Sequence, residues 1–266
     1  MNVYIWQPVV VSDMQWPCPD GFHVPLNTEW QAIYDAGVSL WVWSSSDKNW
    51  FSSYLKIPKA WYLWNNGTTK QNINSVGYYW SSSPYGDEVD YSYRVQFGQY
   101  GTYPQSYSDR SSGCPVRWIK DTPVTPTSSW TTIYQWTWSA GIFHNSTDWL
   151  ISISSDWTTW YTIMDKNLWA TTVYNYWDTL SESNCGKYYQ RWNNYWFPFS
   201  WGWTTSSTQV NVTWYWPWNY YESSTWITTN PRQSSANNWN NLRWWVSQWT
   251  SLKSTELKNA YVGSSS

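Results

Sequence analysis

Glycine and charged residues are both scarce in this sequence, and each scarcity excludes a class of protein. The 266 residues hold only 12 glycines, fewer than the roughly 7% of an average chain and far fewer than a collagen-like repeat requires. Charged residues make up 12%, about half of the usual share, and the formal net charge is −2. Because nucleic-acid-binding proteins carry a basic surface, we expect no nucleic-acid partner.

Cysteine and long apolar runs are also lacking. Three cysteines are an odd number, too few for a disulfide scaffold and without the CxxC spacing of a zinc site, and we expect neither a metal nor another cofactor. No run of about 18 apolar residues exists, so no membrane span is expected. The first residues, MNVYIWQPVVVSD, lack a basic region, and Gln7 and Pro8 interrupt their apolar part, so no signal peptide is visible.

Tryptophan, in contrast, is abundant at places that are typical of glycine. The chain has 30 tryptophans, and the segment NSTDWLISISSDWTTWYTIMD predicts strands over 151–154 and 160–164. Trp149 and Trp157 each follow an aspartate at the turns beside these strands. Asp-Gly is a strong hairpin signal because a type I′ turn needs positive φ at both central residues, a conformation that glycine adopts freely and a bulky aromatic residue does not.

The same pattern recurs elsewhere, at Asn49-Trp50, Asn238-Trp239, Trp201/Trp203, Trp214/Trp216/Trp218 and Trp244/Trp245. Our interpretation is that the gene belongs to a bacterial lineage that reads UGA as glycine and was translated with a table that reads UGA as tryptophan. Trp30, Trp80, Trp160 and Trp226 occur in contexts that suit an aromatic residue, and we take these four as genuine. The alternative is a binding protein that is truly rich in tryptophan.

The chain divides into two segments, 1–121 and 131–266, joined by a Pro/Thr/Ser-rich linker over 122–130. In the first segment Asn27 is expected to cap a helix that buries Trp30, Ile33 and Tyr34 and ends at 35–37. Strands are expected from Tyr78 onward and over 116–120. The alternating residues Tyr91, Tyr93, Val95 and Phe97 are expected to include core positions. The second segment predicts hairpins as far as Asp165, followed by polar loops.

Several strings resemble one known family. They are CPDGFHVP (18–25) followed by Glu29-Trp30, LKIPKAWYLW (55–64), GYYWSSS (77–83), Val116-Arg117, Ile119-Lys120-Asp121, TIMDKNLWAT (162–171) and CGKYYQRWNNYWFP (185–198). They are similar to motifs of the Fibrobacter succinogenes major paralogous domain, in which Trp16, Trp61, Trp64 and Trp169 stand at glycine positions. The resemblance implies an α+β, C-type-lectin-like fold, loop-rich with short antiparallel strands and few helices, close to the formylglycine-generating sulfatase-modifying fold.

The order of these motifs departs from that family. There the half containing MDxNLGA precedes the half containing CPxGxHxP within one domain, whereas here 1–121 is the C-terminal-type half and 131–266 the N-terminal-type half. Either the two segments are pieces of different domains or the chain is a circular permutant, which compact domains with neighbouring termini tolerate. In the first case neither half is expected to have a complete core.

The stretch 81–110 is the candidate functional region, because it is crowded with Tyr, Ser and Asp between motifs that look structural. Tyrosine combines a large rigid contact area with a hydrogen-bonding group, which recognition surfaces favour. The candidate ligand-binding residues are Tyr85, Asp87, Asp90, Tyr100, Tyr103, Tyr107 and Asp109. The resemblance includes the variable proteins of diversity-generating retroelements, which are diversified at this part of the fold. An ordinary polar hairpin is the alternative for this stretch.

We therefore expect a non-catalytic ligand-binding or adhesion module, secreted or at the cell surface, whose partner is a protein or glycan on another cell or surface. His23 is expected to form structural hydrogen bonds and His144 to be solvated, so no enzyme is expected. One alternative is a carbohydrate-binding module with genuine tryptophans that stack on sugars. Another is an oxidase of the formylglycine-generating type, although fold does not imply function. Cys18 and Cys114 are either bridged or buried thiols.

The codon interpretation yields the first prediction. We expect the gene to carry TGA codons at Trp149, Trp157 and Trp169, because each lies at a site that suits glycine. Sequencing the gene decides this, and TGG codons at the three positions contradict the interpretation.

Overall fold

The structure is a computed structural model of the chain. The residues that it describes are 18, 21–40, 49–85, 90–137, 140–191, 193, 195–199, 204–208, 211–212, 224–229 and 232–233. Several sequence positions discussed above therefore lie outside the described residues, namely Trp16, Asp87, Trp239 and the tryptophans at 201, 203, 214, 216, 218, 244 and 245.

Short antiparallel strands dominate the described chain. Its helices are α1 (Asn27–Ser39), α2 (Trp50–Tyr54) and α3 (Glu182–Cys185). The strands of the first segment are β1 (Phe22–His23), β2 (Tyr62–Leu63), β3 (Lys70–Gln71), β4 (Val76–Pro84), β5 (Tyr91–Gly98), β6 (Gly101–Asp109), β7 (Gly113–Cys114) and β8 (Arg117–Lys120). The strands of the second are β9 (Thr131–Thr137), β10 (Ala140–Asn145), β11 (Leu150–Ser154), β12 (Tyr161–Asn167), β13 (Tyr189–Gln190), β14 (Thr205–Ser206), β15 (Asn211–Val212), β16 (Trp226–Ile227) and β17 (Arg232–Gln233).

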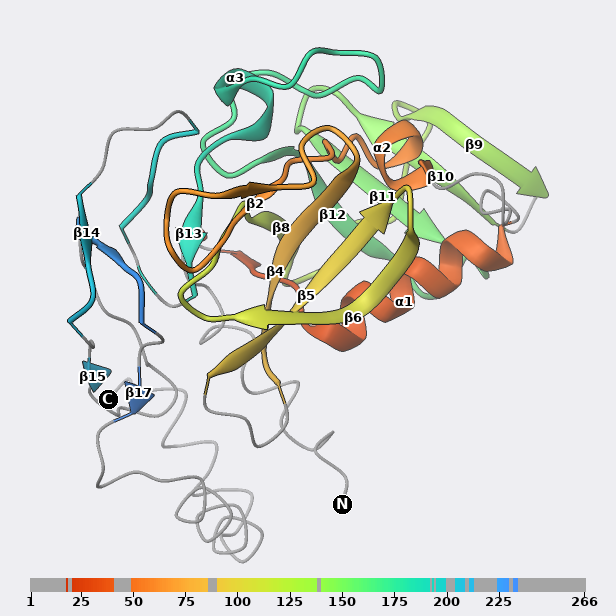
Figure 1. The fold of residues 1–266 in the computed structure, drawn as a ribbon. Coiled ribbons are helices and arrows are strands. Elements are labelled where there is room, and N and C mark those ends of the chain that lie inside the picture. Colours follow the sequence, from red (N-terminus) through yellow and green to blue (C-terminus); the bar gives the residue numbers. More distant parts are fainter. Residues whose placement is uncertain are drawn as a thin grey trace, which may run out of the picture.

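The largest sheet is built from both segments of the chain. Its order is β1-β8-β12-β11-β10-β9, so the last strand of the first segment pairs with a strand of the second (Figure 1). The pairing of β8 with β12 is antiparallel and joins Ile119 to Ile163 and Arg117 to Asn167. The linker also contacts this sheet, because the Val124 N–H donates to Thr162 Oγ1 over 2.8 Å.

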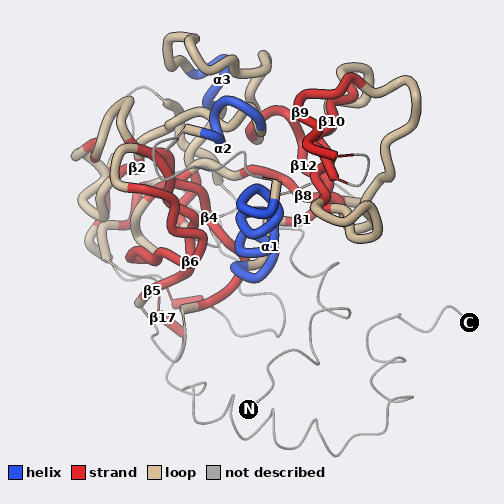
Figure 2. The backbone as a smooth tube through the Cα atoms, turned by 90° about the vertical axis from the view of Figure 1, so that its right-hand side faces the viewer, coloured by secondary structure: helices blue, strands red, loops and turns tan. Residues whose placement is uncertain are grey.

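A second sheet, β4-β5-β6, lies on the other side of α1. Figure 2 shows α1 between this sheet and the six-stranded sheet. The main hydrophobic core fills the same space: Trp30 and Ile33 of α1 pack with Tyr79 of β4, Val95 of β5 and Ile163 of β12, all fully buried. One core therefore draws residues from both sides of the linker. The coarse prediction of a loop-rich fold with short antiparallel strands and few helices is confirmed for the described residues.

The helix α1 forms as the apolar spacing predicts, but its ends differ from the prediction. Leu26 is the N-cap and Asn27 is the first helical residue, so capping by Asn27 is wrong. The Asn27 N–H instead donates to Ser83 Oγ (3.1 Å), and Glu29 reaches back to accept the Leu26 N–H (2.8 Å). The helix also continues to Ser39, beyond the expected end at 35–37, and buries Ala36 and Gly37 in its last turns.

Three tryptophans that the sequence marked as misplaced hold left-handed backbone. The φ angles of Trp149, Trp157 and Trp169 are 58°, 62° and 64°. Trp149 ends the turn between β10 and β11, Trp157 lies in the turn between β11 and β12, and Trp169 follows β12. Bulky residues rarely adopt this conformation, which costs of order 1–3 kcal/mol for a residue other than glycine. The backbone at these positions suits glycine.

The local turn geometry corrects two details of the sequence analysis. The preceding residues Asp148 and Asp156 do not have positive φ, so the turns are not of the expected type I′. The prediction of a tight turn at Asn49-Trp50 is also wrong. Trp50 begins α2 and is fully buried, and its ring centroid lies 4.3 Å from that of Phe51. The Asn-Trp pair is therefore a helix start and not a tight turn.

The four tryptophans taken as genuine are all buried, and all of them donate their indole N–H. Trp30 donates to Trp80 O (3.4 Å), Trp80 to Tyr189 O (2.7 Å), and Trp160 to Trp157 O (3.2 Å). The fourth, Trp226, donates to Asn65 O over 3.2 Å. By contrast, the buried indole N–H groups of Trp50, Trp61, Trp118 and Trp157 have no partner among the described residues. Buried tryptophans normally donate this hydrogen. Among the other suspect positions, the half-exposed Trp169 does donate, to Tyr189 Oη over 2.7 Å.

Two glycines, Gly67 and Gly113, leave room for the Trp226 ring. A Cβ on Gly67 would lie 2.5 Å from the Trp226 ring, and a Cβ on Gly113 would lie 2.3 Å from it. Both distances are shorter than carbon atoms tolerate. The glycines therefore allow the indole to fill the core that it shares with Phe197 and Leu63.

The left-handed positions yield a stability prediction. Trp149→Gly and Trp169→Gly are each expected to raise the free energy of unfolding by about 1 kcal/mol, because the strain disappears and both rings are already half exposed. Trp80→Gly is expected to lower it by about 4 kcal/mol, because it empties a packed core site. Denaturant unfolding measures these changes.

Trp177→Gly is the matched control, because Trp177 is the most exposed described tryptophan and lacks a positive φ. We expect no gain in stability for this variant. A loss of stability in both Trp149→Gly and Trp169→Gly contradicts the assignment of strain to these positions.

Candidate functional site

The candidate residues lie on the sheet β4-β5-β6 and at its ends. Tyr107 and Asp109 belong to β6, Tyr103 lies earlier on the same strand, and Tyr100 lies in the turn between β5 and β6. Tyr85 follows β4 directly, and Asp90 precedes β5. Asp87 lies outside the described residues. The structure divides the described candidates into two groups.

The first group is a cluster of four tyrosines, which we name the tyrosine cluster: Tyr85, Tyr91, Tyr93 and Tyr107. Tyr85 stacks on Tyr107 with ring centroids 4.2 Å apart and meets Tyr93 edge-on at 5.0 Å. Tyr91 meets Tyr107 edge-on at 5.6 Å. These offset and edge-to-face contacts are the favoured geometries of aromatic pairs. The cluster is therefore a packed set of rings that remains on the surface, where Tyr107 is 48% exposed.

The strand register explains why these rings meet. Tyr93 lies opposite Tyr107, and Tyr91 lies opposite Asp109. The side chains of these four residues therefore share one face of the sheet. Towards the other end of β5 the same face passes into the core, where Val95 and Phe97 are fully buried. The expectation of core positions in this strand is therefore confirmed for Val95 and Phe97. Tyr91 and Tyr93 are only partly buried.

Tyr100 and Tyr103 form the second group, away from the tyrosine cluster. The pairing of β5 with β6 shifts between Arg94 and Gln96, and Tyr103 lies opposite Gln96. An irregularity of this kind turns the following side chains to the opposite face, so Tyr103 and Tyr107 project from different sides. The Tyr103 hydroxyl donates to Tyr100 O over 2.8 Å. The predicted site residues are thus not brought together as one surface.

Two buried arginines hold the strand that carries the tyrosine cluster. Arg110 Nε donates to Tyr91 O (3.0 Å), and Arg191 Nε donates to Ser92 Oγ (2.8 Å). Ser92 Oγ in turn donates to Ser83 O over 3.0 Å, which ties β5 to the end of β4. Burial lowers the pKa of Arg110 to about 9, against the raising effect of Asp90, so the guanidinium stays charged at neutral pH. This network holds the start of β5 at Tyr91 and Ser92.

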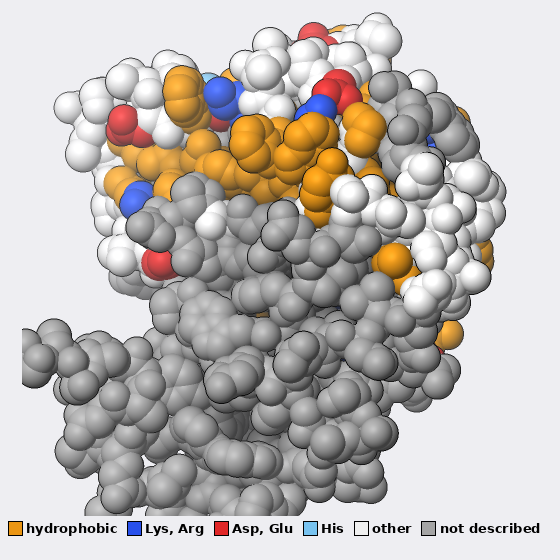
Figure 3. All heavy atoms as spheres, turned by 90° about the vertical axis from the view of Figure 1, so that its left-hand side faces the viewer, with side chains coloured by type: hydrophobic (Ala, Val, Ile, Leu, Met, Phe, Trp, Pro, Cys, Tyr) orange, Lys and Arg blue, Asp and Glu red, His pale blue; other side chains and the backbone are white. Residues whose placement is uncertain are grey.

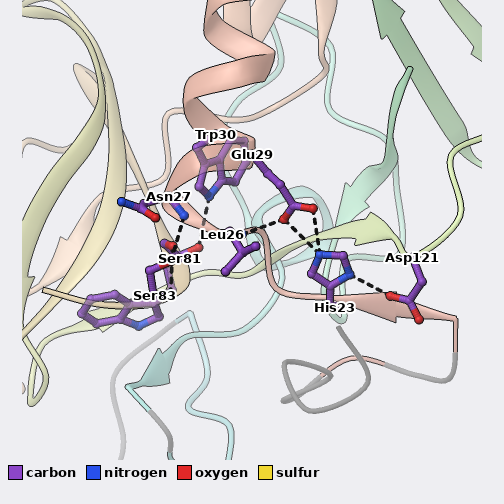
Figure 4. Close-up of polar contacts among 9 residues, drawn as sticks. His23, Leu26, Asn27, Glu29, Trp30, Ser81, Ser83 and Asp121 are labelled. Carbon is purple, nitrogen blue, oxygen red and sulfur yellow. Dashed lines mark hydrogen bonds and ion pairs between the residues drawn. The ribbon is translucent and has the colours of Figure 1, made fainter. Parts of the chain in front are cut away.

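His23 forms the second polar centre of the structure and is 1% exposed. Its Nδ1 lies 2.7 Å from Asp121 Oδ1, and its Nε2 lies 3.0 Å from Glu29 Oε2 (Figure 4). The ring therefore joins β1, the first turn of α1 and the end of β8. Burial alone would lower the pKa of His23, but Glu29 and Asp121 raise it above the ordinary value. The expected structural role of His23 is consistent with this geometry.

His144 has a buried partner that sequence reasoning did not find. Its Nε2 lies 2.8 Å from Oδ2 of Asp165, which is fully buried, so the expectation that His144 is only solvated is wrong. The two residues are 21 positions apart and meet because β10 and β12 flank β11.

The family-like motifs of the two segments converge around β12. Arg117 Nη1 donates to Met164 O (2.7 Å), and Asn167 Nδ2 donates both to Tyr79 Oη and to Cys185 O (2.9 Å each). These contacts join the motif strings at 77–83, 116–117, 162–171 and 185–198. These strings lie far apart in the sequence, and the pairings of β8 with β12 and of β7 with β13 bring them together.

The three cysteines are free and buried. Cys18 and Cys114 lie in the same hydrophobic cluster, and the structure records no bridge between them. Burial raises the pKa of Cys114 and of Cys185 to about 12, and that of Cys18 well above its ordinary value. All three are therefore protonated at neutral pH, whereas nucleophilic chemistry needs the thiolate.

The His23 geometry predicts how stability depends on pH. Because the pKa of His23 is raised in the folded state, its contribution is complete below the ordinary value of about 6.5 and is lost as the pH rises through the folded pKa. We expect the free energy of unfolding to fall over that range in the parent chain. His23→Gln should remove this fall and should cost about 1–3 kcal/mol at low pH. An unchanged pH profile in His23→Gln contradicts the assignment.

Comparison with models of protein families, with curated proteins and with solved structures finds no match to this chain. Among the described residues, no three side chains of His, Cys, Asp or Glu form a group that could hold a metal ion. The helices of the described part are also too short or too polar to cross a membrane. Function is therefore inferred from the geometry of the site itself.

Proposed function

We propose that the chain is a C-type-lectin-like, non-catalytic binding or adhesion module that acts at a cell surface or after secretion. The tyrosine cluster is its contact surface. The observation that carries this proposal is the set of four contacting rings that stays on the surface above a buried arginine network. The variable proteins of diversity-generating retroelements, which the resemblance includes, are diversified at the corresponding part of their fold. We propose the same class of role here.

The construction of the tyrosine cluster supports a role in recognition. A folded chain gains little by leaving several large rings at its surface, and rigid tyrosines lose little conformational entropy when they bind. Buried arginines fix the supporting strand from below, so little ordering remains for the moment of binding. Burial and the nearby Tyr85 raise the pKa of Tyr93, so its hydroxyl stays neutral and can donate or accept a hydrogen bond.

The family resemblance gains support from the convergence of its motifs. In this proposal Arg117, Asn167 and Tyr79 are structural residues that hold the shared core, as their contacts indicate. The left-handed Trp169 stands at the glycine of the string similar to MDxNLGA, where glycine suits the backbone. We propose accordingly that glycine is encoded at 149, 157 and 169, and that the chain joins two halves of a lectin-like domain in permuted order.

A carbohydrate-binding module with genuine tryptophans is the second candidate. Figure 3 shows a band of hydrophobic side chains on one face of the described chain. Exposed tryptophans of the described chain include Trp64, Trp169 and Trp196. The ring centroids of Trp169 and Trp196 are 6.4 Å apart. Such rings can stack on sugars. The strained backbone of Trp169 argues against this candidate, because a stacking platform does not require left-handed φ.

The oxidase of the formylglycine-generating type has less support. Its chemistry depends on a reactive cysteine, and the three thiols of this chain are buried with raised pKa values. Reactive cysteines have lowered pKa values and an accessible position. The proposal therefore assigns no catalytic role to Cys18, Cys114 or Cys185.

Substitutions on the two faces of the β5-β6 hairpin test the proposed function. We expect ligands selected from glycan arrays and peptide libraries to lose at least about tenfold in affinity with Tyr107→Ala, because truncating a central aromatic anchor removes much of the binding energy. Tyr103→Ala removes an equally exposed ring on the opposite face and should leave the affinity unchanged. A template repeat and a reverse transcriptase beside the gene would further support diversified binding.

The same variants distinguish the proposed function from its two alternatives. Binding that survives Tyr107→Ala but is lost with Trp169→Gly and Trp196→Ala supports sugar stacking and contradicts the tyrosine surface. Thiol-dependent turnover that is lost with Cys18→Ser or Cys114→Ser supports the oxidase.

A further inference from the structure

The closest ring contact of the tyrosine cluster joins Tyr85 to Tyr107. Their ring centroids are 4.2 Å apart and their ring planes differ by 28°, whereas the other contacts of the cluster are edge-on at 5.0, 5.6 and 6.4 Å. At this separation carbon atoms of the two rings are in van der Waals contact. Tyr107 is 48% exposed and Tyr85 is partly exposed. Two phenol rings that already touch are therefore open to solvent.

We infer that Tyr85 and Tyr107 form an oxidative modification site, at which a haem peroxidase that uses hydrogen peroxide couples the two rings into a dityrosine cross-link. Holding two reacting groups in contact makes their reaction intramolecular, which acts like a very high local concentration. The inference is independent of the proposed function, because it requires the ring contact and no ligand.

The coupling consumes one molecule of hydrogen peroxide for each cross-link. Each tyrosine hydroxyl gives one hydrogen atom, as an electron and a proton, to the oxidised peroxidase and becomes a phenoxyl radical. The two radicals form one carbon–carbon bond between ring positions ortho to the oxygens. Each bonded carbon then releases its proton and each phenolic oxygen regains one, which restores both aromatic rings. The pair loses two hydrogen atoms in total, and the peroxide is reduced to two molecules of water.

The thiols of the chain are sheltered from such an oxidant. Oxidation of cysteine follows thiolate character and exposure, and Cys18, Cys114 and Cys185 are protonated at neutral pH and at most 8% exposed. Another tyrosine pair, Tyr62 and Tyr78, meets edge-on at 4.7 Å, but these residues are only 6% and 3% exposed. Ring contact and exposure coincide at the pair in the tyrosine cluster.

The cross-link would fasten the end of β4 to β6. These strands flank β5 in the order β4-β5-β6, and all of β5 lies within the loop from 85 to 107 that the new bond closes. A bond that closes a loop constrains the unfolded chain more than the folded one. Since the three cysteines are free, this bond would give the sheet a covalent staple that cysteine does not supply.

Treatment of the full chain with a haem peroxidase and hydrogen peroxide tests this inference. Trypsin cleavage after Arg94 places Tyr85 in peptide 71–94 and Tyr107 in peptide 95–110. We expect mass spectrometry to find these two peptides linked, with a mass lower than their sum by two hydrogen atoms. Tyr85→Phe and Tyr107→Phe should each lower the yield of the linked peptides at least about tenfold, because phenylalanine keeps the ring but has no hydroxyl hydrogen to give.

Two controls show whether the folded ring contact directs the coupling. Tyr103→Phe removes a hydroxyl from a ring that is 50% exposed and should leave the yield unchanged. The parent chain treated in urea should lose the linked peptides, because unfolding separates the two rings. The treated parent chain, refolded or kept folded, should also show an upward shift in its denaturant midpoint, and treated Tyr85→Phe should show none.

Three results overturn the inference. They are the absence of linked peptides from the treated folded chain, an equal yield in the parent chain and Tyr85→Phe, and a yield that rises with protein concentration, which indicates coupling between molecules. None of them bears on the proposed binding function, which the screen with Tyr107→Ala decides separately.

Discussion

The largest sheet depends on backbone that turns left-handed at single residues. Trp149 and Trp157 hold this conformation in the two turns that align β10, β11 and β12, and Trp169 holds it where the chain leaves β12. The register of β12 in turn sets its pairing with β8 across the linker. A residue without a side chain meets this constraint at all three positions, and an indole meets it only under strain.

The strand pairing in this sheet also allows both segments to contribute to one hydrophobic core. With β8 beside β12, α1 packs on residues from both segments. Arg117 donates to Met164 O, and Asn167 donates to Tyr79 Oη, so each side chain has a partner in the other segment. His23 links further elements around this core, because it contacts both Glu29 at the start of α1 and Asp121 after β8. The three-stranded sheet packs on this unit through Tyr79, Val95 and Phe97, which belong to the same core.

Local features of this structure could be predicted from sequence, and long-range features could not. Turn chemistry located the left-handed positions 149 and 157, the family resemblance located 169, and apolar spacing located the buried face of α1. The same turn reasoning failed at Trp50, because Asn-Trp can also begin a helix. No sequence signal shows the register shift that separates Tyr103 from Tyr107, nor the pairing of His144 with Asp165. Both depend on which strands become neighbours.

The most direct test of this account is the amino acid that ribosomes of the source cells place at the left-handed positions. Peptide mass spectrometry of the protein purified from those cells reads it without reference to codons. We predict glycine at 149, 157 and 169 and tryptophan at 80 and 226, where the indoles are buried and hydrogen-bonded. Tryptophan at all five positions would contradict the account.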